Sequence, residues 1–245
     1  MTTDEGLRHI RLEGAFNVRD VGGYTTRDGQ PIRWRRLLRA DSLHRLPPNS
    51  QRALLDYGLG TIIDLRRPSE VARDPNVLAS VPGVIYHNLP VLLDDDGERI
   101  EIASQTPGDL YMFMVEEQQP QLAAIMASLA VSQAPALVHC YVGKDRTGVV
   151  VALALGAAGV PHETIAEDYA LSEELLAPLM AEIRVRRLQL GLDVDRFDRL
   201  TGSPYAAMLG VLEHLEARYS GVRGYLETIG LTPAQIERLR QLLVE

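Results

Sequence analysis

Two kinds of apolar pattern alternate along the chain. Short runs rich in β-branched residues predict buried strands, and longer segments with apolar residues every three or four positions predict helices that pack on them. The expected strands cover 32–39, 61–65, 84–89 and 135–138. The expected helices begin near residues 49, 70, 106, 120, 149, 162, 172, 203 and 232. This alternation is typical of an α/β fold in which helices wrap a mostly parallel sheet.

The stretch 138–148 joins the last expected strand to an apolar, Ala-rich helix. A loop that leads into a helix N-terminus directs free backbone N–H groups at one point, where the helix dipole adds positive charge, so it can bind an anion. Cys140 lies at the base of this loop, and the N–H groups and a guanidinium would stabilise its thiolate. Arg146 can hold two phosphate oxygens in a fork, and Gly143 permits a positive φ.

The residues from His139 to Gly148, HCYVGKDRTG, extend a bare Cys-x5-Arg pattern to ten positions. They resemble the HCxxGKDRTG loop of the atypical bacterial protein tyrosine phosphatases. Three further blocks, at 14–24, 36–43 and 59–73, are similar to the same family. A short Cys-x5-Arg match occurs often by chance, whereas the longer form between a strand and a helix is specific. The alternative is a buried cysteine that packs as a small apolar residue.

The resemblance implies a protein-tyrosine-phosphatase-like α/β fold, a mostly parallel central sheet wrapped by helices, in one domain over 1–245. It also implies that 172–202 forms a helical lid over the active site, and that the lid limits oxidation of the thiolate. The alternative for this segment is a helical hairpin fixed on the core.

The same resemblance implies the site residues. Cys140 would attack phosphorus and form a thiophosphate intermediate, Arg146 would hold the phosphate, and neither a metal nor another cofactor would be required. Asp145 is preferred over Asp64 as the general acid, because the family carries this loop carboxylate and the chain lacks an evident Trp-Pro-Asp-type loop. The expected phosphate-binding residues are those of the loop: Tyr141, Val142, Gly143, Lys144, Asp145, Arg146, Thr147 and Gly148.

The substrate class stays open at this point. Lys144 offers a second cation beside the phosphate, as in the loops of phosphoinositide phosphatases, so phosphotyrosine, phosphoserine or phosphothreonine and inositol lipids are all candidates. A primary phosphoinositide phosphatase and a non-catalytic phosphate-binding module are the alternatives. Arsenate reduction usually needs further thiols, and the chain has one Cys.

Composition and charge limit the kinds of partner and the cellular compartment that we expect. The net charge of −8 argues against nucleic acid as a partner. One Cys allows no intramolecular disulfide, and a reactive thiolate suits a reducing compartment. Residues 1–11 lack the apolar core of a signal peptide, and no apolar run is long enough to span a membrane. We therefore expect a cytoplasmic protein without integral membrane association, while the resemblance leaves export without a cleaved signal open. The oligomeric state is not predicted.

Several residues have a structural and a functional interpretation. The 14–24 block either lines the active site or contains a buried Arg19–Asp20 pair. Asp64 is expected to form an ion pair with a neighbouring Arg, and His139 is expected to order the loop through a backbone hydrogen bond. The acidic stretch 94–98 lacks the spacing of a calcium loop, so it is expected to be a solvated, mobile loop.

Overall fold

The computed structural model describes residues 8–244, so most of the 1–11 segment lies outside it. Five strands within the described residues form one sheet in the order β1-β2-β5-β3-β4. β2, β5, β3 and β4 are parallel, and β1 pairs with β2 in the antiparallel direction. The strands are β1 (Arg19–Asp20), β2 (Leu37–Ala40), β3 (Thr61–Asp64), β4 (Ile85–Asn88) and β5 (Ala136–His139). The mostly parallel sheet confirms the predicted fold class.

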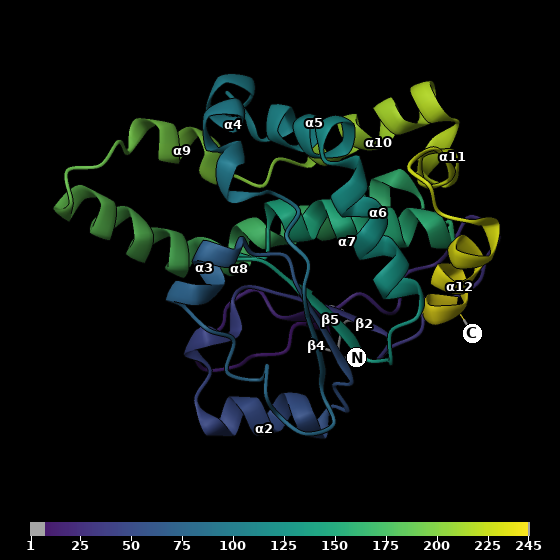
Figure 1. Cartoon of the computed structure of the whole chain (residues 1–245), viewed down its shortest axis with the longest axis horizontal. Helices are drawn as coiled ribbons and strands as arrows, with labels where there is room; N and C mark the ends of the chain where they lie inside the picture. Colours follow the sequence, from purple (N-terminus) through teal and green to yellow (C-terminus); the bar gives the residue numbers. More distant parts are fainter. Residues whose placement is uncertain (1–7, 245) are drawn as a thin grey trace.

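Alternate side chains of the strands face opposite layers, as the two-residue period of a strand requires. On β5, Ala136 and Val138 belong to the larger apolar core, whereas Leu137 belongs to the smaller one. Figure 1 shows the two layers: α5, α6 and α7 lie on one side of the sheet, and α2 lies on the other. β2, β3 and β5 are therefore buried on both faces, which explains why they are short apolar runs in the sequence, whereas β4 at the edge of the sheet is partly exposed.

The helices follow the predicted alternation with the strands. α2 (Pro48–Asp56), α3 (Pro68–Arg73), α5 (Pro107–Glu117) and α6 (Gln119–Ala130) precede β5 or connect the strands before it. Thr106 caps α5 as predicted, since its hydroxyl accepts a hydrogen bond from the backbone N–H of Asp109. After β5 come α7 (Asp145–Ala158), α8 (His162–Gln189), α9 (Asp195–Thr201), α10 (Tyr205–Tyr219), α11 (Gly221–Thr228) and α12 (Pro233–Val244).

Two predicted boundaries are wrong. The strand expected over 32–39 is confined to β2, because Arg35 adopts a positive φ of 61° and its backbone N–H is held by Asp20 Oδ2 at 2.7 Å. The helices expected at 162–170 and from 172 are one helix, α8. Ser172 does not cap a new helix but is buried, and its hydroxyl accepts a hydrogen bond from Arg19.

The acidic stretch 94–98 is also not the solvated loop that the sequence suggested. It forms the 3-10 helix η2 (Asp94–Asp96) and the start of α4 (Gly97–Ala103). Asp96 is buried, and its carboxylate accepts hydrogen bonds from the backbone N–H of Leu93 at 2.8 Å and from Gln118 Nε2 at 3.0 Å. Within the described chain, no group of three or more His, Cys, Asp or Glu side chains is placed to hold a metal ion.

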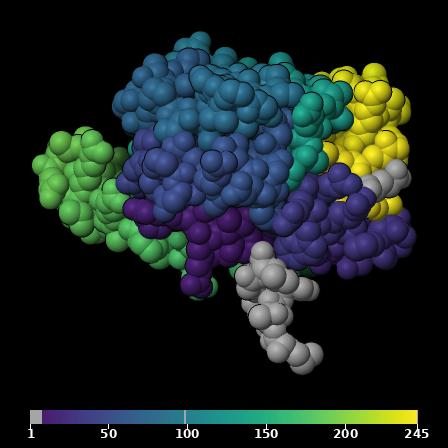
Figure 2. All heavy atoms as spheres, turned by 90° about the horizontal axis from the view of Figure 1, so that it is seen from below, coloured from purple at the N-terminus to yellow at the C-terminus, as the bar shows by residue number. Residues whose placement is uncertain are grey.

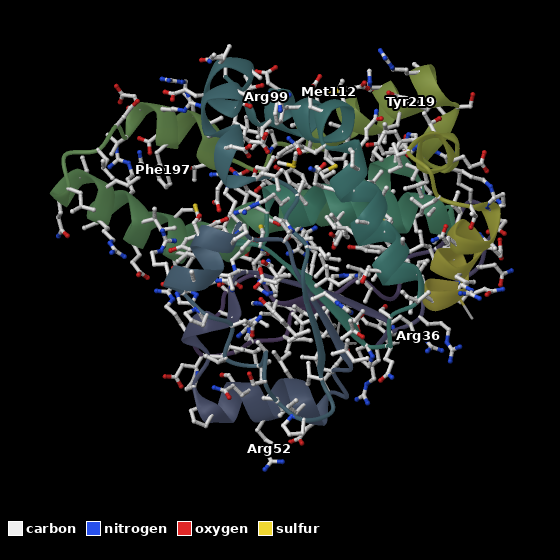
Figure 3. The ribbon with its side chains drawn as sticks, in the orientation of Figure 1. Arg36, Arg52, Arg99, Met112, Phe197 and Tyr219 are labelled. Atoms are coloured by element: carbon white, nitrogen blue, oxygen red, sulfur yellow. The ribbon has the colours of Figure 1, made fainter. Side chains whose placement is uncertain are left out.

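The distal half of α8 and all of α9 project from the body of the molecule. Figure 1 shows them extending to one side, and Figure 2 shows them as a separate green lobe. The buried residues of α8 end at Leu179, whereas Val185 and Leu188 are half exposed. In Figure 3, Phe197 of α9 points toward α8, where the guanidinium of Arg187 lies 5.4 Å from the ring centroid. None of the described helices is both long and apolar enough to cross a membrane.

Candidate active site

The loop 140–144 leaves the carboxyl end of β5, the middle strand of the sheet, and leads into α7. Ligands bind at this edge in open parallel sheets, where neighbouring strands leave a crevice. Gly143 has a φ of +68°, and a Cβ atom there would lie 2.3 Å from the carbonyl oxygen of Ala40 on β2. The loop can therefore approach β2 this closely only with glycine at position 143.

The carbonyl groups of residues 141–143 accept hydrogen bonds from residues that lie outside the loop. The backbone N–H of Ser42 donates to Tyr141 O at 3.0 Å, and Asn17 Nδ2 donates to Val142 O at 3.2 Å and Gly143 O at 3.0 Å. A trans peptide points its C=O and the following N–H in opposite directions. Because the carbonyl groups face outward, the intervening N–H groups turn toward the interior of the loop and make a concave anion site.

A buried charge network supports the loop from behind. The carboxylate of Asp168 on α8 lies 3.3 Å from Arg19 Nε and 2.6 Å from Arg39 Nη1, and all three side chains are 1% exposed. Arg39 also donates to Gly143 O at 3.0 Å. Burial alone would raise the pKa of Asp168, but the two guanidinium groups hold it well below its usual range. Asp168 is therefore an ionised anchor rather than a proton donor.

The Arg19–Asp20 pair, one of the two interpretations of the 14–24 block, is not formed, since Arg19 binds Asp168 instead. The carboxylate of Asp20 accepts hydrogen bonds from the backbone N–H of Gly22 at 2.7 Å and the hydroxyl of Tyr57 at 2.6 Å. Together with the Asn17 contacts, this places the 14–24 block against the back of the loop, as the active-site interpretation suggested.

Cys140 and Arg146 occupy the base and rim of the loop. Cys140 is 1% exposed. Arg146 Nη1 and Nη2 contact the two carboxylate oxygens of Glu70 on α3 at 2.5 and 3.0 Å. Burial lowers the pKa of Arg146, but the negative charges of Cys140 and Glu70 outweigh burial and raise it above its ordinary value. Thr147 Oγ1 is buried and has no hydrogen-bond partner among the described residues.

The two candidate acids have different surroundings. Asp145 begins α7 and its side chain is 23% exposed. Asp64 is fully buried, and its carboxylate accepts hydrogen bonds from Arg66 Nη2 at 2.7 Å and Tyr86 Oη at 2.9 Å. Burial raises the pKa of Asp64, but His139, which is protonated only at acid pH, and Arg66 lower it below its usual value. The expected ion pair of Asp64 with a neighbouring Arg is present.

His139 contacts the backbone as expected. Its Nδ1 lies 3.2 Å from the carbonyl oxygen of Cys140, and its Nε2 lies 3.0 Å from Asn76 Nδ2. Complete burial lowers the pKa of His139. The neutral ring therefore fixes the start of the loop and carries no charge to the site near neutral pH.

The sequence suggested that Lys144 is a second cation beside the phosphate. In the structure its side chain points away from the loop instead. Its ammonium donates to the carbonyl oxygens of Leu200, Thr201 and Gly202 at 2.7, 2.9 and 3.0 Å. These carbonyl groups lie at the C-terminal end of α9, where a cation is favoured by the helix dipole. Lys144 is 2% exposed, so the projecting lobe is fastened to the loop by a buried charge.

Comparison with known proteins identifies the family of the chain. The model of the tyrosine phosphatase family matches residues 10–245. The chain belongs to the tyrosine phosphatase family. A tyrosine-protein phosphatase of Nostoc commune is 30% identical over 83% of this chain and 72% of its own length. The triple specificity protein phosphatase PtpB of Mycobacterium tuberculosis is 30% identical over 95% of this chain and 98% of its own length. The chain is thus a phosphoric monoester hydrolase that acts on phosphorylated substrates.

A cleft of about 780 Å³ opens beside the loop of this tyrosine phosphatase. Tyr141 and Glu70 belong to its floor, and Leu179, Ile183 and Leu190 of the projecting segment line its far wall. Five arginines also line the cleft: Arg45, Arg67, Arg73, Arg186 and Arg187. Four carboxylates, of Asp41, Glu70, Asp74 and Glu182, line the cleft as well, and Arg45 and Arg73 form ion pairs with Glu182 and Asp74. The cleft is therefore of mixed charge, and the remaining arginines are the cations that could meet an anionic substrate.

Sequence reasoning missed several residues that contact the loop residues. Glu70 lies in the 59–73 block and was noted only as the start of a helix, although an acid at that position is also a capping signal. Tyr111 and Asp168 lie within expected helices, and neither position carries a local signal; Asp168 supports the loop through Arg39. Asn17 and Arg39 lie in blocks that resemble the family, and this resemblance is the sequence signal that could have pointed to their contacts with the loop.

Proposed function

We propose that this tyrosine phosphatase hydrolyses phosphate monoesters through a thiophosphate intermediate on Cys140. One observation carries the proposal. A buried cysteine lies at the base of a loop whose carbonyl groups at residues 141–143 are held outward, with a guanidinium fork at the rim. Such a loop supplies positive charge to the equatorial oxygens of a phosphoryl group as charge spreads over them.

In the first step, the Cys140 thiolate attacks phosphorus as the bond from phosphorus to the substrate oxygen breaks. Arg146 and the N–H groups of the loop hold the remaining phosphate oxygens. Asp145 gives its proton to the leaving oxygen, which departs as a neutral alcohol or phenol. In the second step, Asp145 takes a proton from water, the water oxygen bonds to phosphorus, and the sulfur–phosphorus bond breaks. Inorganic phosphate leaves, and the thiolate is restored with the hydrogen bond of Thr147.

Asp145 is the better candidate for the acid on geometric grounds. It starts the helix that follows the loop and is partly exposed, so a leaving group can reach it. Asp64 is fully buried and its two oxygens are engaged by Arg66 and Tyr86. An ionised, saturated carboxylate has no proton to give.

We propose that the substrates extend beyond phosphotyrosine to phosphoserine, phosphothreonine and phosphoinositides. Arg67, Arg186 and Arg187 support this breadth, because these arginines of the cleft form no ion pair with a described residue and multiply phosphorylated ligands carry charge beyond the reacting phosphate. The name of the M. tuberculosis relative describes a triple specificity. A primarily phosphoinositide-directed enzyme is the alternative within the same mechanism.

We also propose that 172–202 acts as a lid. The distal half of α8 forms the far wall of the cleft, and the end of α9 is bound by Lys144 of the loop. Only the part of α8 up to Leu179 has buried side chains. Motion of the segment beyond Leu179 would therefore cost little buried apolar area and mainly the hydrogen bonds of Lys144 to the end of α9. The segment would shield the thiolate when closed.

The test is phosphate release without added metal from a phosphotyrosine peptide, a phosphoserine peptide and phosphoinositide vesicles. Cys140→Ser should abolish release from every substrate that the wild type turns over, while its thermal unfolding stays close to that of the wild type. The ranking of substrates separates a broad phosphatase from a lipid-directed one. Binding of the peptide without any turnover would support a phosphate-binding module and contradict the proposal.

A further inference from the structure

Two buried tyrosines meet behind Asp145. The hydroxyl of Tyr111 on α5 donates to Asp145 Oδ1 at 2.7 Å, and it also contacts the hydroxyl of Tyr169 on α8. The rings are packed edge to face, with centroids 5.7 Å apart at 79°. Both tyrosines are at most 1% exposed. Both hydroxyl groups are therefore fixed in the core by packing of their rings, and neither is a mobile surface group.

The direction of these hydrogen bonds follows from the protons available. Burial, followed by the charge of Asp145, raises the pKa of Tyr111 well above its ordinary value, and burial does the same for Tyr169. Both hydroxyls therefore keep their protons at any working pH. Each has one proton to donate. Since Tyr111 donates to Asp145, Tyr169 donates to the oxygen of Tyr111, and the chain of bonds ends on the carboxylate.

The polar contacts of the Asp145 carboxylate with Tyr111 and Lys144 both fall on Oδ1. Lys144 Nζ lies 3.4 Å from the same Oδ1 that Tyr111 binds. Oδ2 accepts no hydrogen bond from the part of the chain that the structure describes. A carboxyl group with one oxygen anchored and the other free has a fixed orientation and a defined place for its proton.

Tyr169 is itself held firmly. Gly148 allows its ring to reach the first turn of α7, because a Cβ atom on Gly148 would lie 2.9 Å from Tyr169 Cδ2. The preceding residue, Asp168, is bound by Arg19 and Arg39. The hydroxyl chain therefore joins the aspartate to a rigid part of the core.

We infer that Tyr111 and Tyr169 are positioning residues that anchor Oδ1 of Asp145 and leave Oδ2 to carry the proton to the leaving group. This inference rests on the proposed role of Asp145 as general acid. The two hydroxyl groups hold the carboxyl group of Asp145 in the orientation needed for proton transfer to the leaving oxygen. A small displacement of this group would lower the rate of that step substantially.

Tyr111→Phe keeps the ring and removes the bond to Oδ1. We expect kcat/KM, which reports on the step in which the leaving group departs, to fall about tenfold for a phosphotyrosine peptide, whose leaving group needs protonation. The loss of kcat/KM for p-nitrophenyl phosphate, whose leaving group is stable without a proton, should be much smaller. Tyr225→Phe is the matched control, because it removes a buried hydroxyl that donates to Val115 O, away from the loop.

A double-mutant cycle separates positioning from a general structural role. In the Asp145→Asn background, Tyr111→Phe should cause no further loss with the peptide, because the group that it positions is no longer an acid. Additive losses in the cycle, or equal losses on both substrates, would overturn the inference. Tyr169→Phe should give a smaller loss with the same leaving-group dependence, and it replaces Tyr111→Phe if thermal unfolding shows that variant to be unfolded.

The same data separate the inference from the proposed function. If Asp145→Asn loses activity equally on both substrates, the acid is elsewhere, and the proposed role fails together with this inference. If Asp145→Asn shows the leaving-group dependence and neither tyrosine variant does, the role of Asp145 stands and the inference alone is wrong.

Discussion

Arg146 can hold Glu70 and a phosphate at the same time because its guanidinium has two usable edges. Glu70 contacts Nη1 and Nη2, the end of the fork. No described residue accepts a hydrogen bond from Nε, so the edge formed by Nε and Nη2 stays available. Burial raises the pKa of Glu70, but the hydrogen bonds and charge of Arg146 outweigh it and keep the carboxylate ionised. Glu70 therefore orients Arg146 rather than competing with the substrate.

Glu70→Ala should lower kcat/KM by about ten- to a hundredfold, because the guanidinium then has to be ordered by the substrate itself. Steady-state kinetics on a phosphotyrosine peptide measure this change. Glu70→Gln retains one acceptor and should lose less. Arg99→Ala serves as a control, since Arg99 forms an exposed ion pair with Glu117 away from the loop. An increase in kcat/KM for Glu70→Ala would mean that Glu70 blocks the site.

At the level of single residues, the sequence indicated the groups that lie consecutively in the loop. Cys140, Gly143 and Arg146 are found together because ten adjacent positions determine their relation. The sequence did not predict the roles of Glu70, Tyr111 and Tyr169, because the residues that they contact lie 34 to 76 positions away in the sequence. No local pattern specifies which distant side chain meets the loop.

At the level of elements, the contact between Lys144 and α9 ties the proposed lid to the phosphate-binding loop. Three carbonyl oxygens accept from one ammonium, and the charge lies at the negative end of the helix. The sequence predicted the strand, loop and helix that contain Lys144 but not this contact, because a lysine in an anion loop was expected to bind the anion.

Lys144→Met should loosen the lobe that contains α9. We expect hydrogen exchange of 195–201 to become severalfold faster, because the last turn of the helix loses its cation and its hydrogen bonds. If the lobe is a lid, inactivation by peroxide should accelerate in parallel. Arg218→Met, which removes an exposed cation on α10, is the control. Unchanged exchange and unchanged inactivation would contradict the fastening role.

At the level of the whole molecule, the order of the strands places β5 between β2 and β3 and so puts the loop in the middle of one sheet edge. The alternation of apolar runs predicted the layers. It did not predict the order of the strands or the turn at Arg35, because pairing of distant strands depends on contacts that a local pattern does not contain. Arg19, Arg39 and Asp168 come from three separate segments and meet only when the sheet and α8 are assembled.

The most direct measurement is the detection of a phosphoenzyme. A phosphotyrosine peptide is mixed with the wild type, the reaction is quenched during turnover, and the fragments are analysed by mass spectrometry. The account predicts one added phosphate on the fragment that contains Cys140, on the sulfur, and none in Cys140→Ser. A phosphate bound to any other residue, or full turnover by Cys140→Ser, would contradict it.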